Sequence, residues 1–204
     1  SFQEIAEQAA DGFEYLVYEK NFPVFAGVTT PVKELGWADW YSSMGIAGVT
    51  MPFTGEAAVN PNTPKVTLPF TICHEMAHRM CIAPERDANL AAFLSSTANS
   101  HVLYQYSGYF MAFRYCYSAL YSAGTSETAA AAARIDLEIN DYLRYDLTQY
   151  DKFFAKHRDD TLTNIADSVN DTYIKVMGDE QGVKSYGLVI ELYHAYIKKD
   201  EIGL

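Results

Sequence analysis

The sequence has few cysteines, and they form no recognisable framework. Cys73, Cys81 and Cys116 are the three cysteines in 204 residues, and no two of them have C-x-x-C spacing. An odd count without such spacing does not indicate a disulfide-stabilised fold. We expect Cys73 and Cys81 to be small buried residues rather than metal ligands or nucleophiles.

Positive charge is also scarce. The chain has 15 Lys and Arg against 26 Asp and Glu, which gives a formal net charge of −11, and it has no cluster of basic residues. Such a surface repels the phosphates of a nucleic acid and the headgroups of an anionic membrane. The sequence therefore predicts that neither of these is a direct partner.

Long apolar runs are missing as well. No stretch approaches the roughly 20 apolar residues that cross a bilayer, and the chain does not open with a signal peptide. It begins with Ser1-Phe2-Gln3 rather than Met, which suggests processing or a piece of a longer protein. We therefore expect a soluble domain, whose link to a membrane would be an N-terminal segment that precedes this sequence.

What remains is the composition of a globular protein with many tyrosines. Hydrophobic residues make up 49% of the chain and aromatic residues 14%, with 16 Tyr. This length allows one domain with a sizeable core. The sequence shows no internal repeat, no low-complexity linker and no shift in composition, so residues 1–204 are predicted to form a single domain.

The spacing of apolar residues predicts a mainly α fold (α+β) with a small β element. A first amphipathic helix is expected over residues 3–19, ended by Phe22-Pro23, and a short helix starting at Pro31. Residues 44–53 are β-rich and contain Pro52, which is typical of an edge strand, and a loop or short hairpin follows over residues 54–64. Further helices are predicted over 68–81, 84–98, 101–123, 126–156 (broken near Asn140-Asp141), 161–177 and 185–199.

The helix predicted over residues 68–81 carries the most informative motif, His-Glu-x-x-His. His74 and His78 are four residues apart, so a helix places both imidazoles on one face, close enough to bind one tetrahedral metal ion. Glu75 lies beside them, where a carboxylate can take a proton from a metal-activated water and pass it to a leaving amine. The motif indicates a zinc hydrolase, although the same spacing also arises by chance in helices.

Catalytic zinc has three protein ligands, so a third must be found. Pro84 suits the first turn of a new helix, and a turn between Met80 and Pro84 would fold Glu85 back towards the histidines. We therefore prefer Glu85 as the third ligand, with Asp87 as the alternative. Both acidic residues could also be present only because a helix dipole favours negative charge in the first turn.

A hydrolase of this type needs a hydrogen-bond donor for the oxyanion that forms on the attacked carbonyl. Tyr186 and His194, which lie in polar aromatic clusters outside the metal helix, are our candidates. Each could equally be an aromatic residue that packs in the core with its polar group at the rim. Glu56 and Asn60 could reach the site from the preceding loop or could shape a turn.

The order of these motifs resembles an uncharacterised bacterial family with a domain of unknown function. The resemblance covers most of the chain and rests on Met51-Pro52-Phe53-Thr54-Gly55-Glu56, Leu68-Pro69-Phe70-Thr71, His74-Glu75-Met76-Ala77-His78, Glu85-x-x-Ala88-Asn89, Tyr106-Ser107-Gly108-Tyr109 and Val183-Lys184-Ser185-Tyr186-Gly187. Members of that family resemble membrane-tethered zincins, which have hydrophobic N-terminal helices ahead of a soluble domain. The resemblance therefore implies the soluble domain of a membrane-anchored bacterial protein.

The segment Glu85-x-x-Ala88-Asn89 is also similar to the E-x-x-A-D element of HtpX-like membrane zincin peptidases. In those peptidases the Glu is the third zinc ligand, so this resemblance favours Glu85 over Asp87. One difference concerns the turn after the metal helix. The family usually continues with Gln-Arg-Gly, whereas this chain has Arg79-Met80-Cys81 and so lacks the glycine.

The sequence thus predicts a zincin-like helical domain, with a small β edge element before the metal helix and one zinc on His74, His78 and Glu85. The expected activity is hydrolysis of peptide bonds with Glu75 as general base, on a peptide or protein substrate that adds to the edge strand near residues 46–49. Two alternatives remain open. One is a catalytically degenerate zincin that binds a peptide or a cell-envelope partner, and the other is a zinc hydrolase of a non-peptide amide.

Overall fold

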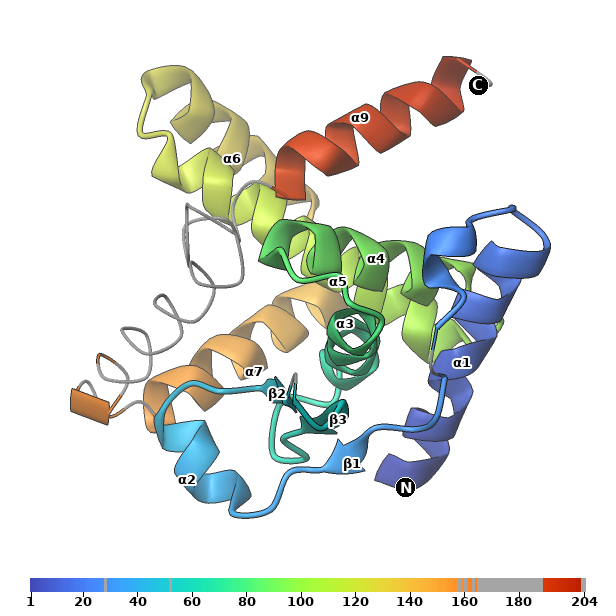
Figure 1. Cartoon of the computed structure of the whole chain (residues 1–204). Coiled ribbons are helices and arrows are strands. Elements are labelled where there is room, and N and C mark those ends of the chain that lie inside the picture. The colour runs from blue at the N-terminus through green and yellow to red at the C-terminus, as the bar shows by residue number, and fades with distance from the viewer. Residues whose placement is uncertain are drawn as a thin grey trace.

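The computed structural model describes residues 1–27, 29–51, 53–157, 159, 161–162, 164 and 189–202 (Figure 1). In chain order its elements are helix α1 (Phe2–Tyr18), the 3-10 helix η1 (Pro23–Phe25), strand β1 (Lys33–Glu34), α2 (Ala38–Ser43), β2 (Gly48–Met51), β3 (Glu56–Val59), α3 (Leu68–Arg79), α4 (Glu85–Ala98), α5 (Val102–Ser122), α6 (Ser126–Glu138), α7 (Asp141–His157) and α9 (Val189–Ile202). The prediction of a mainly α fold with a small β element is confirmed.

Helix α3 lies at the centre of the molecule. Nine of its 12 residues are buried, because α1, α4 and α5 pack around it and the sheet lies beneath it (Figure 1). A helix that is buried on nearly every side is apolar nearly all round, as Phe70, Ile72 and Met76 illustrate. Its first turn is tied to α5, since the backbone N–H of Phe70 donates to Ser107 Oγ at 3.0 Å.

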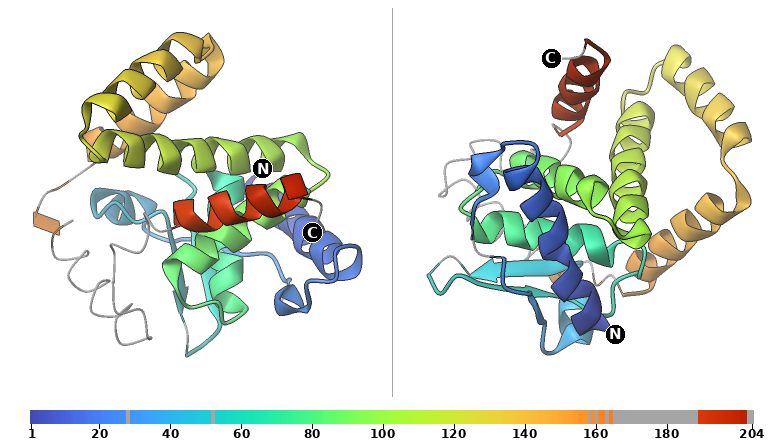
Figure 2. Two further views of the ribbon diagram at one scale, coloured as in Figure 1. Left: turned by 90° about the horizontal axis from the view of Figure 1, so that it is seen from above. Right: turned by 90° about the vertical axis from the view of Figure 1, so that its right-hand side faces the viewer.

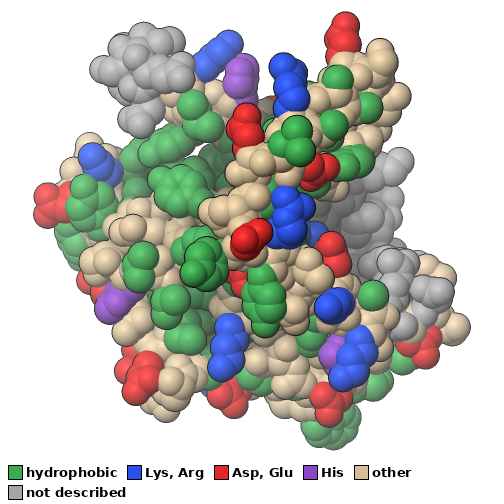
Figure 3. All heavy atoms as spheres, turned by 180° about the vertical axis from the view of Figure 1, so that it is seen from behind, with side chains coloured by type: hydrophobic (Ala, Val, Ile, Leu, Met, Phe, Trp, Pro, Cys, Tyr) green, Lys and Arg blue, Asp and Glu red, His purple; other side chains and the backbone are tan. Residues whose placement is uncertain are grey.

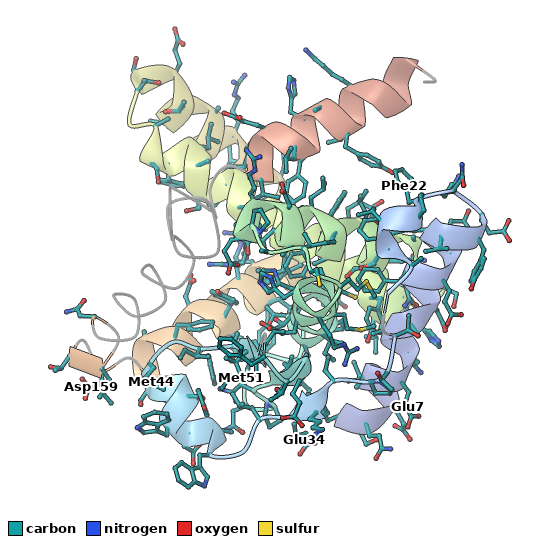
Figure 4. The ribbon with its side chains drawn as sticks, in the orientation of Figure 1. Glu7, Phe22, Glu34, Met44, Met51 and Asp159 are labelled. Carbon is teal, nitrogen blue, oxygen red and sulfur yellow. The ribbon has the colours of Figure 1, made fainter. Side chains whose placement is uncertain are left out.

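The three strands form one sheet in the order β1-β3-β2. Strand β1 runs parallel to β3, and β2 runs antiparallel to β3 with Thr50 opposite Ala57. Glu34 and Met51 mark the two outer strands in Figure 4. Within the described part of the chain β2 is thus an edge strand, as predicted, and the segment that follows it completes a hairpin rather than a loop.

One expectation about the N-terminal third is wrong and another is confirmed. Residues 31–36 do not begin a helix, because Lys33 and Glu34 pair with Ala58 and Val59 of β3, and α2 starts only after Trp37. The first helix agrees with the range predicted over residues 3–19, since α1 ends at Tyr18, ahead of Phe22-Pro23, and Pro23 then opens the 3-10 helix η1. Pairing with β3 is a long-range interaction that local sequence signals do not report.

The helices from α3 to α7 follow the predicted ranges. The expected break is present: α6 ends at Glu138, and Asn140 Oδ1 accepts a hydrogen bond from the backbone N–H of Leu143 at 2.9 Å, which caps α7. The helix predicted over residues 161–177 lies almost wholly outside the described residues. Helix α9 covers the later part of the helix predicted over residues 185–199 and extends to Ile202.

Close contacts join the helices around α3. Figure 2 shows α1 along one side of the helical core and α9 across α4 and α5. Gly12 of α1 lies so near the Ser95 carbonyl of α4 that a side-chain methyl group there would overlap it. The Tyr104 hydroxyl of α5 donates to the Ile5 carbonyl of α1. These contacts hold α1 against α4 and α5, the two helices that pack with it around α3.

The surface carries both signs of charge. Seen from behind, charged side chains lie scattered among hydrophobic ones (Figure 3). None of the helices that the structure describes combines the length and the hydropathy needed to cross a membrane.

The turn after α3 is made without a glycine. Cys81 has φ of 67°, in the left-handed region that Gly adopts without cost, and its side chain is exposed. The expectation that Cys81 is buried is therefore wrong, whereas Cys73 is fully buried in the core. The left-handed residue reverses the chain between α3 and α4, so that both helices can pack against each other.

We expect Cys81→Gly to stabilise the protein by about 1 kcal/mol, because a left-handed conformation costs an L-residue roughly 1–2 kcal/mol. Chemical denaturation would measure this free energy of unfolding. The matched control is Cys116→Gly within α5, where the backbone is helical and the same replacement should destabilise by about 0.3 kcal/mol through helix propensity. A loss of stability in Cys81→Gly would contradict the assigned conformation.

Candidate metal centre

The histidines of α3 and the first residue of α4 meet in one buried cluster. His74 Nε2 lies 3.0 Å from His78 Nε2 and 3.2 Å from Glu85 Oε2, and His78 Nε2 lies 3.5 Å from Glu85 Oε1. The side chains of all three are at least four-fifths buried, with exposed fractions of 12%, 16% and 9%. Among the described residues, this is the group of His, Cys, Asp and Glu side chains that could hold a metal ion.

The turn between the two helices explains how Glu85 reaches the histidines. Pro84 is the extended residue at the N-cap of α4, with ψ of 131°, so α4 begins at Glu85 immediately beside the end of α3. Asp87 points elsewhere: its carboxylate lies 3.2 Å from Arg86 Nε, and 38% of its side chain is exposed. Of the two acidic residues considered as third ligand, the structure brings only Glu85 to the histidines.

A backbone contact orients His78. Its Nδ1 lies 2.9 Å from the Ile82 carbonyl, in the turn before α4. Because a carbonyl can only accept, Nδ1 carries the proton in the neutral imidazole, and the lone pair is on Nε2. The nitrogen that faces Glu85 and His74 is therefore the one able to bind a cation, and the tautomer is set by a contact typical of metal-binding histidines.

The charges in the cluster depend on one another. Burial alone would lower the pKa of His78, but hydrogen bonding to Glu85 and the nearby carboxylates raise it to about 9. Burial would raise the pKa of Glu85, yet the two imidazoles hold it well below its ordinary value. Without a cation, the positive charge of protonated His78 balances the negative charge of the Glu85 carboxylate. Glu85 Oε2 is buried, and His74 Nε2 lies 3.2 Å from it without the alignment of a good hydrogen bond.

Glu75 is also buried, but it lies outside the cluster and against strand β2. Its Oε2 accepts a hydrogen bond of 2.7 Å from the Thr50 hydroxyl, and a side-chain methyl group on Gly48 would overlap its carboxylate. Burial raises the pKa of Glu75, an effect that the His74 and His78 imidazoles and Thr50 oppose and that Glu85 reinforces. A raised pKa is what makes a carboxylate an effective base near neutral pH.

Sequence reasoning did not identify the residues that surround these carboxylates. The sequence predicts Gly48 and Thr50 only as part of a strand, because local sequence does not show which helix residue a strand will face. Asn89, one helical turn after Glu85, accepts a hydrogen bond of 3.2 Å from the Tyr115 hydroxyl on α5. Asn89 Nδ2 is buried without a hydrogen-bond partner among the described groups.

The remaining candidates lie elsewhere. Tyr186 is outside the described residues, and His194 is exposed on α9, next to Tyr193, which packs on α4. Glu56 is exposed and pairs with Lys33 at 2.5 Å. Asn60 shapes its turn: its buried side-chain amide donates to three acceptors from residues 38–46. The structure thus brings neither Glu56 nor Asn60 into the cluster.

An apolar groove of about 500 Å³ lies between α4, α5 and α9. Its lining includes Phe93, Tyr109, Phe113 and Tyr193, and it contains none of the three clustered residues. The groove is therefore separate from the candidate metal centre.

Comparison with known proteins assigns the chain to a family. The model of a family described as "Protein of unknown function (DUF3810)" matches residues 3–193, so the chain belongs to this family. Neither a curated protein nor a solved structure matches the chain.

Proposed function

We propose that this member of the DUF3810 family is a zinc-dependent metallopeptidase, in which His74, His78 and Glu85 hold the metal and Glu75 is the general base. The observation that carries the proposal is the spacing of the facing atoms. The two Nε2 atoms of His74 and His78 lie 3.0 Å apart, and each lies near one oxygen of Glu85, at 3.2 and 3.5 Å respectively. Ligands at 2.0–2.1 Å from a tetrahedral zinc lie about 3.3 Å from one another. The observed separations are close to this value, which supports the proposal that one metal ion binds between the three residues.

The types of donor atom support zinc rather than a harder cation. Two imidazole nitrogens and one carboxylate suit zinc, whereas magnesium and calcium prefer oxygen ligands alone. A cation would also offset the negative charge of Glu85 Oε2, a buried oxygen whose neighbour in the cluster is His74 Nε2 at 3.2 Å. The Nδ1 of His78 is held by Ile82, so the lone pair of the neutral ring is on Nε2, which faces the cluster.

Glu75 has the position of a base rather than a ligand. When bound, zinc supplies Lewis-acid polarisation of the substrate carbonyl and makes a water more acidic. Glu75 accepts the proton of the attacking water and passes it to the departing amine, and its buried setting favours this by raising the pKa of the carboxyl. The Thr50 hydroxyl donates a hydrogen bond to one of the two carboxylate oxygens of Glu75.

The backbone groups at the outer edge of strand β2 support the proposal that the substrate is a peptide. The Asn60 N–H donates to the Ala47 carbonyl at 2.8 Å, which makes these two residues a hydrogen-bonded pair. Because such pairs alternate along an antiparallel ladder, Gly48 and Thr50 direct their backbone N–H and C=O groups away from β3. An extended peptide could pair with those groups beside Glu75, which favours a peptide over a non-peptide amide.

We expect about one zinc per chain in the wild-type protein, because three ligands converge in a buried cluster. Elemental analysis after zinc loading and desalting would measure the content. His78→Ala and Glu85→Ala should each reduce zinc strongly, whereas the control His101→Ala, which removes a 41%-exposed histidine near Asp11, should keep it. Equal zinc in all variants would refute the site.

Glu75→Gln should keep zinc but lower turnover by at least about 100-fold, since positioned proton transfer contributes roughly that much. Digestion of a peptide library, read by mass spectrometry, would compare wild type, Glu75→Gln, chelator-treated protein and the control Glu56→Gln, whose carboxylate is exposed. Cleavage that persists in Glu75→Gln would contradict the assigned role. No cleavage by zinc-loaded wild type would instead favour a peptide-binding module.

We also propose that the domain works beside a membrane, because its motifs resemble those of membrane-tethered zincins and HtpX-like peptidases. Fractionation of cells that contain the complete protein would test this. The protein should stay in the membrane fraction after a high-salt wash and leave it with detergent. Release by salt alone, or recovery in the soluble fraction, would contradict the proposal.

A further inference from the structure

We infer that Thr50 is a positioning residue for Glu75, so that the edge strand offered to the substrate also holds the general base. The inference rests on the proposed function. It adds a second role for β2, which would bind the peptide backbone and set the geometry of the proton transfer at the same time.

The contact between Thr50 and Glu75 links a strand to a helix. The Thr50 hydroxyl oxygen lies 2.7 Å from Glu75 Oε2 and 3.1 Å from the main-chain carbonyl oxygen of the same residue. Hydroxyl to carboxylate bonds of about 2.5–2.7 Å are among the stronger hydrogen bonds in proteins. A partly buried bond of this length restricts the rotation of the carboxylate, which would otherwise be free to turn towards the metal ligands.

Gly48 restricts the carboxylate from another side. A side-chain methyl group at this position would overlap Oε1, Cγ and Cδ of Glu75, so the carboxylate packs directly on the glycine backbone. Gly48 and Thr50 are two residues apart, and side chains at that spacing point to the same face of a strand. The Glu75 carboxylate is therefore held from two sides. Its Oε2 accepts from the Thr50 hydroxyl, and its Oε1 packs on the backbone of Gly48.

The same two residues carry the backbone groups that point away from β3. A peptide that pairs with Gly48 and Thr50 would touch the residues that hold Glu75. Binding energy from such remote contacts can be used to orient reacting groups, in which case peptides too short to reach them lose kcat as well as affinity. The substrate class that fits is an extended polypeptide that pairs with the whole of β2, rather than a dipeptide.

Kinetics of Thr50 variants would test the role. Thr50→Val removes the hydroxyl at nearly constant shape, and we expect kcat to fall about 10- to 100-fold with zinc content unchanged, because a base displaced by about 1 Å can lose that much. Thr50→Ser keeps the donor and should stay within about three-fold of wild type. The matched control is Thr54→Val on the same hairpin, whose exposed hydroxyl accepts a hydrogen bond from the Glu56 N–H and which should leave kcat unchanged.

A second measurement does not depend on activity. In zinc-loaded protein, a double-mutant cycle of Thr50→Val and Glu75→Ala, which removes both carboxylate oxygens that could accept from Thr50, should show coupling of about ten-fold in the unfolding equilibrium constant, measured by denaturant unfolding. The parallel cycle with Thr54→Val should show none. An uncoupled pair overturns the inference, and so does unchanged kcat in Thr50→Val.

The two measurements separate the inference from the proposed function. If zinc-loaded wild type cleaves no peptide, the peptidase proposal fails, and with it the catalytic part of the inference. Coupling would then still show that Thr50 holds the carboxylate. If wild type cleaves and Glu75→Gln does not, but Thr50→Val keeps full kcat, only the inference fails. An equal loss of kcat in Thr50→Val and Thr50→Ser would also overturn the inference. Thr50→Ser keeps the hydroxyl, so loss of the hydroxyl could not then be the cause.

Discussion

Helix α3 carries two imidazoles and a carboxylate into an otherwise apolar core, and the rest of the structure has to satisfy them. A buried polar group without a partner costs several kcal/mol, and a buried charge costs more. The partner for the two histidines comes from another helix, since Glu85 is the first residue of α4. The end of α3, the left-handed turn at Cys81 and the start of α4 must therefore keep a fixed geometry. The packing of α1 and α5 behind these helices maintains it.

The two glutamates next to the histidines have opposite environments. Glu85 points into the cluster, where the imidazoles hold its pKa low and keep it charged, which suits a ligand. Glu75, the neighbour of His74 in sequence, turns towards β2, where burial raises its pKa. Different surroundings can give chemically identical groups different roles, and a pair of carboxylates whose pKa values are pushed apart is a common sign of a catalytic site. The proposed division into ligand and base follows from this difference.

The small sheet contributes more than its few residues suggest. Strand β2 packs against α3 on one face and leaves its outer edge unpaired within the described part of the chain. Exposed edges are usually shielded because they invite pairing with other chains. Here the unpaired edge of β2 lies next to the buried Glu75 carboxylate and the candidate metal centre. In the proposed function this edge would pair with an extended substrate. A glycine at position 48 is compatible with this, because any side chain would displace Glu75.

The amino-acid sequence by itself determined the features that depend on local spacing. The four-residue separation of His74 and His78, the restart of a helix after Pro84 and the periodicity of apolar residues are short-range signals, and they sufficed for the helices from α3 to α7, the edge strand and the three clustered residues. Tertiary structure alone decided what depends on contacts between distant segments. The pairing of β1 with β3 replaced the helix expected at Pro31, and the hydrogen bond from Thr50 to Glu75 joins residues 25 positions apart. No local propensity encodes which residue of a buried helix a strand will face, because that choice is made by the packing of the whole core.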